Sequence, residues 1–122
     1  MVLDFADADA FWSAADAFVQ QSVVVIERAR ESQHPRWAGT EYPLDYGYLE
    51  RTRSSDGGGV DVWRGSLPDQ RVTGVIVTVD LVKRDAEPKL CLGCTAAEMQ
   101  MALAFHNRGS QAGLLIVRLP SS

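Results

Sequence analysis

Four aspartates in two equally spaced pairs are the residues whose types and spacing best suit chemistry. Asp56 and Asp61 flank a triple glycine, while Asp80 and Asp85 lie beside the two lysines of the chain. Hard cations such as magnesium prefer oxygen ligands, and magnesium often shares its coordination sphere with waters and phosphate oxygens. The spacing therefore predicts a metal-assisted site for a phosphorylated substrate. The alternative is two solvated, turn-forming loops, in which Asp is also common.

Length, charge and hydropathy define the class of protein. A chain of 122 residues predicts one domain over residues 1–122, with residues 1–21 as an N-terminal helical extension. The formal charge of -4 and the scattered arginines give no basic stripe, so we expect no nucleic-acid partner. The acidic N-terminus does not resemble a signal peptide, and no apolar run has the length of a membrane span. We expect a cytoplasmic protein that does not associate with membranes.

The two cysteines form a single C-x-x-C motif, Cys91 to Cys94. We expect this segment to be a strand, where a separation of three residues places the thiols on opposite faces. A structural zinc site needs about four ligands, and His34 and His106 show no ligand spacing to the cysteines. The motif therefore predicts buried, unpaired core thiols rather than a zinc site or a redox pair.

The periodicity of the apolar residues predicts the elements that position the aspartates. A helical stripe predicts an amphipathic helix over residues 8–20, capped by Asp7 or Asp9, and the capping box Thr95-Ala-Ala-Glu98 predicts a helix over residues 95–107. Strands are expected near residues 22–27, 46–51, 60–64, 71–82, 89–94 and 113–119. Pro88 is expected to separate two of them, and Gly74 to mark a bulge or a close approach. We expect a mainly β (α+β) fold, an antiparallel sheet of five or six strands curled into a small closed barrel.

Three motifs follow one another in a recognisable order. They are Tyr42-Pro-Leu-Asp-Tyr-Gly-Tyr48, then Asp56-Gly-Gly-Gly-Val-Asp61, then Asp80 with Asp85 and Lys89. This order resembles the soluble family I inorganic pyrophosphatases, which carry Y-P-x-x-Y-G-Y, D-G-D-P-x-D and a strand ending in two Asp residues five apart. The resemblance covers roughly residues 23–94. It implies an OB-like barrel, magnesium-dependent hydrolysis of inorganic pyrophosphate by a metal-activated water, and a homo-oligomer.

The resemblance also implies roles for individual side chains. The metal ligands would be the four aspartates, Asp56, Asp61, Asp80 and Asp85. Tyr46 and Lys89 would contact phosphate, and with Asp61 they form the expected catalytic set. Glu27 corresponds to an acidic residue beside the metal ligands that helps to hold the substrate. Arg36, with His34 or Arg28 as alternatives, would replace phosphate-binding groups of a family loop that is shorter here.

Departures from the family pattern keep other functions open. Gly58 stands where the family has the middle Asp of D-G-D-P-x-D, the carboxylate thought to help activate the water. Loss of a general base commonly costs about a hundredfold to ten-thousandfold in rate. The chain also has no Tyr or Lys after Lys89, so the family's C-terminal Tyr-Lys pair is missing. The alternative is a weakened domain that binds, or hydrolyses, another diphosphate metabolite.

Overall fold

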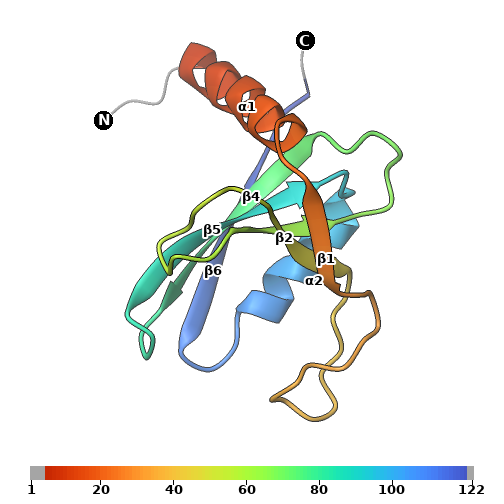
Figure 1. Ribbon diagram of the computed structural model, residues 1–122, viewed down its shortest axis with the longest axis vertical. Coiled ribbons are helices and arrows are strands. Elements are labelled where there is room, and N and C mark those ends of the chain that lie inside the picture. The colour runs from red at the N-terminus through yellow and green to blue at the C-terminus, as the bar shows by residue number, and fades with distance from the viewer. Residues whose placement is uncertain (1–4, 121–122) are drawn as a thin grey trace.

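The computed structural model describes residues 5–120, which form a six-stranded sheet with one helix on each face (Figure 1). In chain order the elements are α1 (Phe5–Gln20), β1 (Val24–Arg28), β2 (Asp45–Leu49), β3 (Val60–Arg64), β4 (Val72–Asp80), β5 (Asp85–Leu92), α2 (Ala96–His106) and β6 (Gln111–Val117). The strands lie side by side in the order β1-β2-β3-β5-β4-β6. The fold is mixed α+β, as the sequence predicts. Between residues 5 and 120, no helix is long and apolar enough to cross a membrane.

The sheet is mixed, so the prediction that it is antiparallel throughout is wrong, and it is not closed, so the predicted closed barrel is not confirmed. The two outer strands are β1 and β6, and among the described residues they do not pair with each other. The pair β3–β5 is parallel, with Asp61 opposite Lys89, while every other neighbouring pair is antiparallel. The parallel pair arises because β4 lies on the far side of β5. β5 then returns between β3 and β4 in the same direction as β3.

Alternation along the strands divides the side chains between two cores. On β3, Val60 and Val62 face α1 and pack with Trp12 of that helix, whereas Trp63 packs in the core beneath α2. Successive side chains of a strand point to opposite faces, so Asp61 lies on the α2 side with Trp63. The same rule places Lys89 on the α2 side. Asp61 and Lys89 thus lie on the same face as His106, at the C-terminal end of α2, and line one cavity with it.

The strand β5 runs through Pro88, which was expected to separate two segments. Pro88 lies opposite Val77 of β4, while β3 pairs with β5 only from Lys89 onward. A proline is tolerated in a strand where no neighbouring strand needs its N–H. The predicted boundary is therefore wrong, and the acidic residues Asp85 and Glu87 belong to the same strand as Lys89.

The two cysteines are buried and unpaired, as predicted, but they do not face opposite sides of the sheet. Both belong to the core beneath α2. β5 ends at Leu92, and Gly93 has a φ of +56°, which turns the chain before Cys94. The rule of alternating faces does not apply across such a turn. Burial and the neighbouring thiol of Cys94 raise the pKa of Cys91, so this thiol remains protonated.

The helix α2 begins and ends where the sequence predicts. The Thr95 hydroxyl accepts a hydrogen bond from the backbone N–H of Glu98, and the Glu98 carboxylate accepts one from the N–H of Thr95 at 2.8 Å. The Glu98 carboxylate also accepts from the N–H of Ser66, which ties the helix to the loop after β3. The first helix differs from its prediction. α1 already begins at Phe5, so Asp7 and Asp9 lie inside it and neither is its N-cap.

Candidate active site

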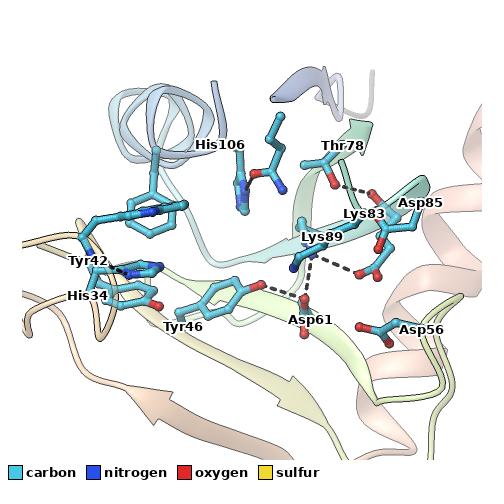
Figure 2. A pocket seen from close by; sticks show the side chains of 14 residues that line it. His34, Tyr42, Tyr46, Asp56, Asp61, Thr78, Lys83, Asp85, Lys89 and His106 are labelled. Atoms are coloured by element: carbon cyan, nitrogen blue, oxygen red, sulfur yellow. Dashed lines mark hydrogen bonds and ion pairs between the residues drawn. The ribbon is translucent and has the colours of Figure 1, made fainter. Parts of the chain in front are cut away.

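A cavity of about 170 Å³ lies between the α2 face of the sheet and the loop of residues 33–41. Its ionic lining consists of four carboxylates and two lysines, namely Asp56, Asp61, Asp85, Glu87, Lys83 and Lys89. We call this space the inner cavity. Figure 2 shows that Asp61, Lys89 and Tyr46 point toward one another in it. The two acidic loops of the sequence thus meet in space through three of their four aspartates.

Lys89 is the centre of a compact ionic cluster. Its Nζ donates to Oδ2 of Asp61 at 2.7 Å and to Oε2 of Glu87 at 3.2 Å. The Lys89 side chain is 8% exposed. Burial by itself lowers the pKa of this amine, but Asp61 and Glu87 outweigh it, and the pKa is raised. Lys89 is therefore a cation in the folded protein.

The phenol of Tyr46 donates to the same oxygen of Asp61, at 2.7 Å. Burial, followed by the negative charge of Asp61, raises the pKa of Tyr46 well above its usual range. The phenol therefore stays protonated and acts as a donor. Since Asp61 Oδ2 accepts from both Tyr46 and Lys89, the carboxylate is oriented from two sides while Oδ1 accepts no hydrogen bond from residues 5–120.

Glu87 and Asp56 have pKa values displaced in opposite directions. Burial raises the pKa of Glu87, which is 6% exposed, against the opposing effect of Lys89. The hydroxyl of Ser54 at 2.6 Å and the N–H of Gly58 at 2.9 Å lower the pKa of Asp56. The shifts make Glu87 the weaker acid and Asp56 the stronger acid of the two relative to exposed carboxyl groups. Glu87 is a functional candidate that the sequence reasoning missed. Its signal is the spacing of residues 85, 87 and 89, which share one face of a strand.

Asp80 lies at the end of β4, opposite Asp85, but it does not line the inner cavity. Its Oδ1 accepts from the N–H groups of Val82 and Lys83, both at 3.0 Å, and from the hydroxyl of Ser110 at 3.1 Å. Asp80 therefore stabilises the turn that joins β4 to β5. Its assignment as a metal ligand stays a prediction.

Two further candidates also lie outside the inner cavity. Glu27 is exposed on β1, where the register with β2 shifts between Ile26 and Arg28. Arg36 lines a neighbouring cavity with Lys83. Their roles in substrate binding stay predictions. By contrast, the structure brings Tyr46, Asp56 and Asp61 together with Asp85 and Lys89.

His106, on the last turn of α2, is a buried neutral base at the wall of the cavity. Its Nε2 accepts from the indole N–H of Trp63 at 2.9 Å, so its proton resides on Nδ1, 2.9 Å from Oε1 of Gln111. Burial lowers the pKa of His106 to about 4, which outweighs the effect of Gln111. The sequence predicted that His106 lies on this helix. It did not predict the contacts with Trp63 and Gln111, which hold the ring at the cavity wall.

The loop of residues 33–41 covers one side of the inner cavity. The His34 ring stacks on Trp37, with centroids 4.0 Å apart, and on Tyr42 at 5.6 Å. Its Nδ1 accepts from the backbone N–H groups of Arg36 and Trp37. Burial and the neighbouring arginines, Arg108 first, lower the pKa of His34. The loop is thus held by this aromatic stack together with backbone hydrogen bonds between its two arms, such as the one that His34 N–H donates to the Thr40 carbonyl at 2.7 Å.

The carboxylate chemistry of the site suits a hard cation, although no complete binding site is present in advance. Within residues 5–120, no three His, Cys, Asp or Glu side chains are close enough to hold a metal ion. Magnesium, however, is commonly bound by one or two carboxylates, with waters and substrate phosphates completing the octahedron. Asp56 and Asp85 form no salt bridge with any described residue. Their oxygens therefore fit an ion that enters together with a phosphate.

Comparison with solved structures identifies the architecture that carries this cavity. An inorganic pyrophosphatase from Helicobacter pylori superposes with a TM-score of 0.58 at 17% identity, covering 79% of this chain and 82% of that one. The protein has the inorganic pyrophosphatase fold. An inorganic pyrophosphatase from Coxiella burnetii gives 0.57 at 13% identity, covering 77% and 82% of the two chains. An inorganic phosphatase from Anaplasma phagocytophilum gives 0.56 at 16%, covering 84% and 86%.

The comparison of sequences has a different outcome. The chain matches no protein-family model, and no curated protein is detectably similar to it. At 13–17% identity, the structural likeness establishes the fold and leaves the chemistry to be argued from the site.

Proposed function

We propose that this protein hydrolyses inorganic pyrophosphate to phosphate with the help of magnesium. The observation that carries the proposal is the inner cavity, which four carboxylates line together with a buried lysine, within an inorganic pyrophosphatase fold. Such a cavity repels a free anion, so the acidic groups and a diphosphate are compatible only when cations lie between them.

Asp56, Asp61 and Asp85 are the three predicted ligands that line the inner cavity, and each magnesium ion would be held by one or two of them together with waters and phosphate oxygens. When bound, magnesium neutralises the phosphate oxygens and lowers the pKa of a coordinated water. Asp61 has one oxygen oriented by Tyr46 and Lys89, and its other oxygen is free to accept a hydrogen bond from the attacking water. Lys89 supplies the fixed positive charge nearest to these carboxylates and would contact a phosphate oxygen.

Proton transfer to the leaving phosphate would come from Glu87. Burial raises its pKa against the effect of Lys89, which favours the protonated form more than in an exposed glutamic acid. It lies 3.2 Å from Nζ of Lys89, the group proposed to contact the substrate. Asp56, with its lowered pKa, would remain ionised at the same time. The two carboxyl groups would therefore perform different tasks in one cavity.

The proposal is tested by phosphate release from pyrophosphate in the presence and absence of magnesium. We expect release that requires the metal, and a loss of about a hundredfold or more in Asp61→Asn and Asp85→Asn. Asp9→Asn is the matched control, because Asp9 is exposed on α1 and lines no cavity. Circular dichroism of each variant separates loss of activity from loss of folding. No release at any magnesium concentration would refute the proposal.

A second candidate is a domain that binds a diphosphate without turning it over. Gly58 favours it, because no side chain stands where the family carries its water-activating carboxylate. Lys89 favours it as well, since it already pairs with Asp61 and Glu87. Calorimetry that detects magnesium-dependent binding of pyrophosphate, with no phosphate released over hours, would support this alternative over the enzyme.

A further inference from the structure

A second, larger cavity of about 590 Å³ opens beside the inner one. Its lining includes Arg36, Asp80, Lys83 and Arg108. We call it the outer cavity. The two cavities share four lining residues, His34, Trp37, Lys83 and Gln111, so they are adjoining parts of one hollow. The volume of the outer cavity falls within the range of small-molecule sites, which is about 300 to 1,000 Å³, whereas the inner cavity lies below it.

The outer cavity has the opposite electrostatic character to the inner one. Three cations line it, Arg36, Lys83 and Arg108, and none of them forms a salt bridge with a described residue. Asp80 is the single acid in its lining, and three donors already bind its Oδ1. In a protein with a formal charge of -4, unpaired cations gathered around one cavity are not a background effect. They provide a site for an anion.

One of these cations is held in place before any ligand binds. Nη1 of Arg108 donates to the hydroxyl of Thr40 at 3.1 Å. Its guanidinium carbon lies 5.1 Å from the ring centre of Phe105 and 5.2 Å from that of Trp37, within the range of cation–π contacts. Arg108 thereby joins the loop of residues 33–41 to the segment after α2. An arginine fixed in this way loses little side-chain entropy when it binds an anion.

Lys83 connects the two environments because it lines both cavities. It lies in the turn between β4 and β5, with Asp80 and Asp85 at the two ends of that turn. A ligand that extends from the acidic inner cavity past Lys83 would meet Arg36 and Arg108 next. The ligand that fits this sequence of charges is itself a chain of anionic groups. Inorganic pyrophosphate would fill only the inner part.

We propose that the outer cavity binds the third and later phosphoryl groups of a linear phosphate chain whose terminal diphosphate lies in the inner cavity. The substrate class is therefore an oligophosphate of three or more phosphoryl groups, either free or attached to a nucleoside. This inference rests on the proposed function for its chemical step. The water oxygen bonds to the terminal phosphorus and the bridging P–O bond breaks. The bridging oxygen keeps the electron pair and stays on the shortened chain. Orthophosphate and the shortened chain leave as two separate products, and one water proton passes to solvent.

Phosphate release from three substrates tests the inference. We expect kcat/KM for tripolyphosphate to exceed that for pyrophosphate by about tenfold, because two or three more ionic contacts form. Arg36→Gln removes a cation that lines only the outer cavity, and it should lower the ratio of the two values by about threefold to tenfold. Arg84→Gln is the matched control, since Arg84 lies in the same turn as Lys83 but lines neither cavity. Use of ATP as well as tripolyphosphate would mean that a nucleoside is accommodated, and exclusion of ATP would indicate free oligophosphate.

A binding measurement separates this inference from the proposed function. Calorimetry with magnesium compares methylenediphosphonate with the bis-methylene analogue of tripolyphosphate, neither of which is hydrolysed. We expect tighter binding of the longer analogue, with the difference reduced in Arg36→Gln and retained in Arg84→Gln. Equal binding of the two analogues, or a ratio that Arg36→Gln leaves unchanged, would overturn the inference even if pyrophosphate is hydrolysed. Preferential binding without hydrolysis of any substrate would support the outer cavity while refuting the proposed enzymatic function.

Discussion

Lys89 is the side chain on which the charge balance of the inner cavity depends. It pairs with Asp61 at 2.7 Å and with Glu87 at 3.2 Å. Removal of one partner from a buried ionic cluster commonly costs about 3 to 5 kcal/mol, because the remaining charges are left unpaired. Lys89 therefore contributes to folding as well as to the proposed chemistry. Any variant at this position needs a stability measurement beside its rate.

Gly58 offers a direct test of how the water is activated. A Cβ built at this residue would meet only the Asp56 carboxylate, with its Oδ1 at 3.3 Å, so a side chain fits. Under the proposed function, we expect Gly58→Asp to raise the rate of phosphate release from pyrophosphate by about tenfold or more, since the new carboxylate would act as a general base. Gly58→Asn is the matched control of similar shape. Equal rates in the two variants would show that a carboxylate at this position has no role in activating the water.

The neutral state of His106 predicts a dependence of stability on pH. The folded pKa of about 4 lies below the ordinary histidine pKa of 6.5, so the unfolded chain binds more protons between these values. Stabilisation is therefore complete above about pH 6.5 and is lost as the pH falls toward 4. The full difference corresponds to about 3 kcal/mol. We expect wild type to lose more stability than His106→Gln between pH 7 and pH 4.5 in urea unfolding.

The substitution His106→Gln was chosen because glutamine can accept from Trp63 and donate to Gln111. The comparison with this variant removes the contribution of the carboxylates, which titrate in both proteins. If the two stability curves remain parallel over this pH range, the buried neutral histidine would not be the group responsible.

At the scale of elements, Gly47 shows why the Y-G-Y motif needs its glycine. Gly47 lies opposite Ile26 of β1, and a Cβ at this residue would overlap the carbonyl oxygen of Val25. We expect Gly47→Ala to displace β1 and to lower the free energy of unfolding by about 3 kcal/mol. Gly58→Ala is the control, because its added methyl group has space. Chemical denaturation measures both, and a loss below about 0.5 kcal/mol in Gly47→Ala would contradict the close approach.

The strand bounds show which features of the sheet local sequence patterns predict. The range of β3, residues 60–64, was predicted as the structure has it, and Gly74 marks a shift in the register of β4, as expected. The start of β5 was missed because Pro88 suggested a break in the strand. The strand tolerates Pro88 because β3 pairs with β5 only from Lys89 onward. This single error concealed Glu87. A strand that begins at Asp85 places residues 85, 87 and 89 on one face, whereas a strand that begins at Lys89 does not.

At the scale of the whole molecule, the sheet separates the site from the packing of α1. Oδ1 of Asp16 accepts from the N–H of Val72 at 2.9 Å, and its Oδ2 accepts from Arg118 at 2.8 Å. These contacts join α1 to β4 and to the segment after β6, on the face opposite α2. We expect Asp16→Asn to lower the free energy of unfolding by about 1 to 2 kcal/mol and to leave phosphate release unchanged. Asp9→Asn should change neither quantity, and a parallel fall in activity and stability would show that the two faces are coupled.

Local information in the sequence determined the motifs, the ends of α2, the burial of the cysteines and the mixture of helices and strands. These features depend on residues near one another along the chain, through hydrogen bonds of a few residues' span and through alternating apolar side chains. The tertiary structure decided the open sheet, the parallel pairing of β3 with β5 and the position of Asp80 outside the inner cavity. It also brought Arg36 and Arg108 together, although they lie 72 positions apart. Such contacts depend on the order of strands in the sheet. The energy of pairing two strands depends on residues of both, so the local sequence of either strand does not predict it.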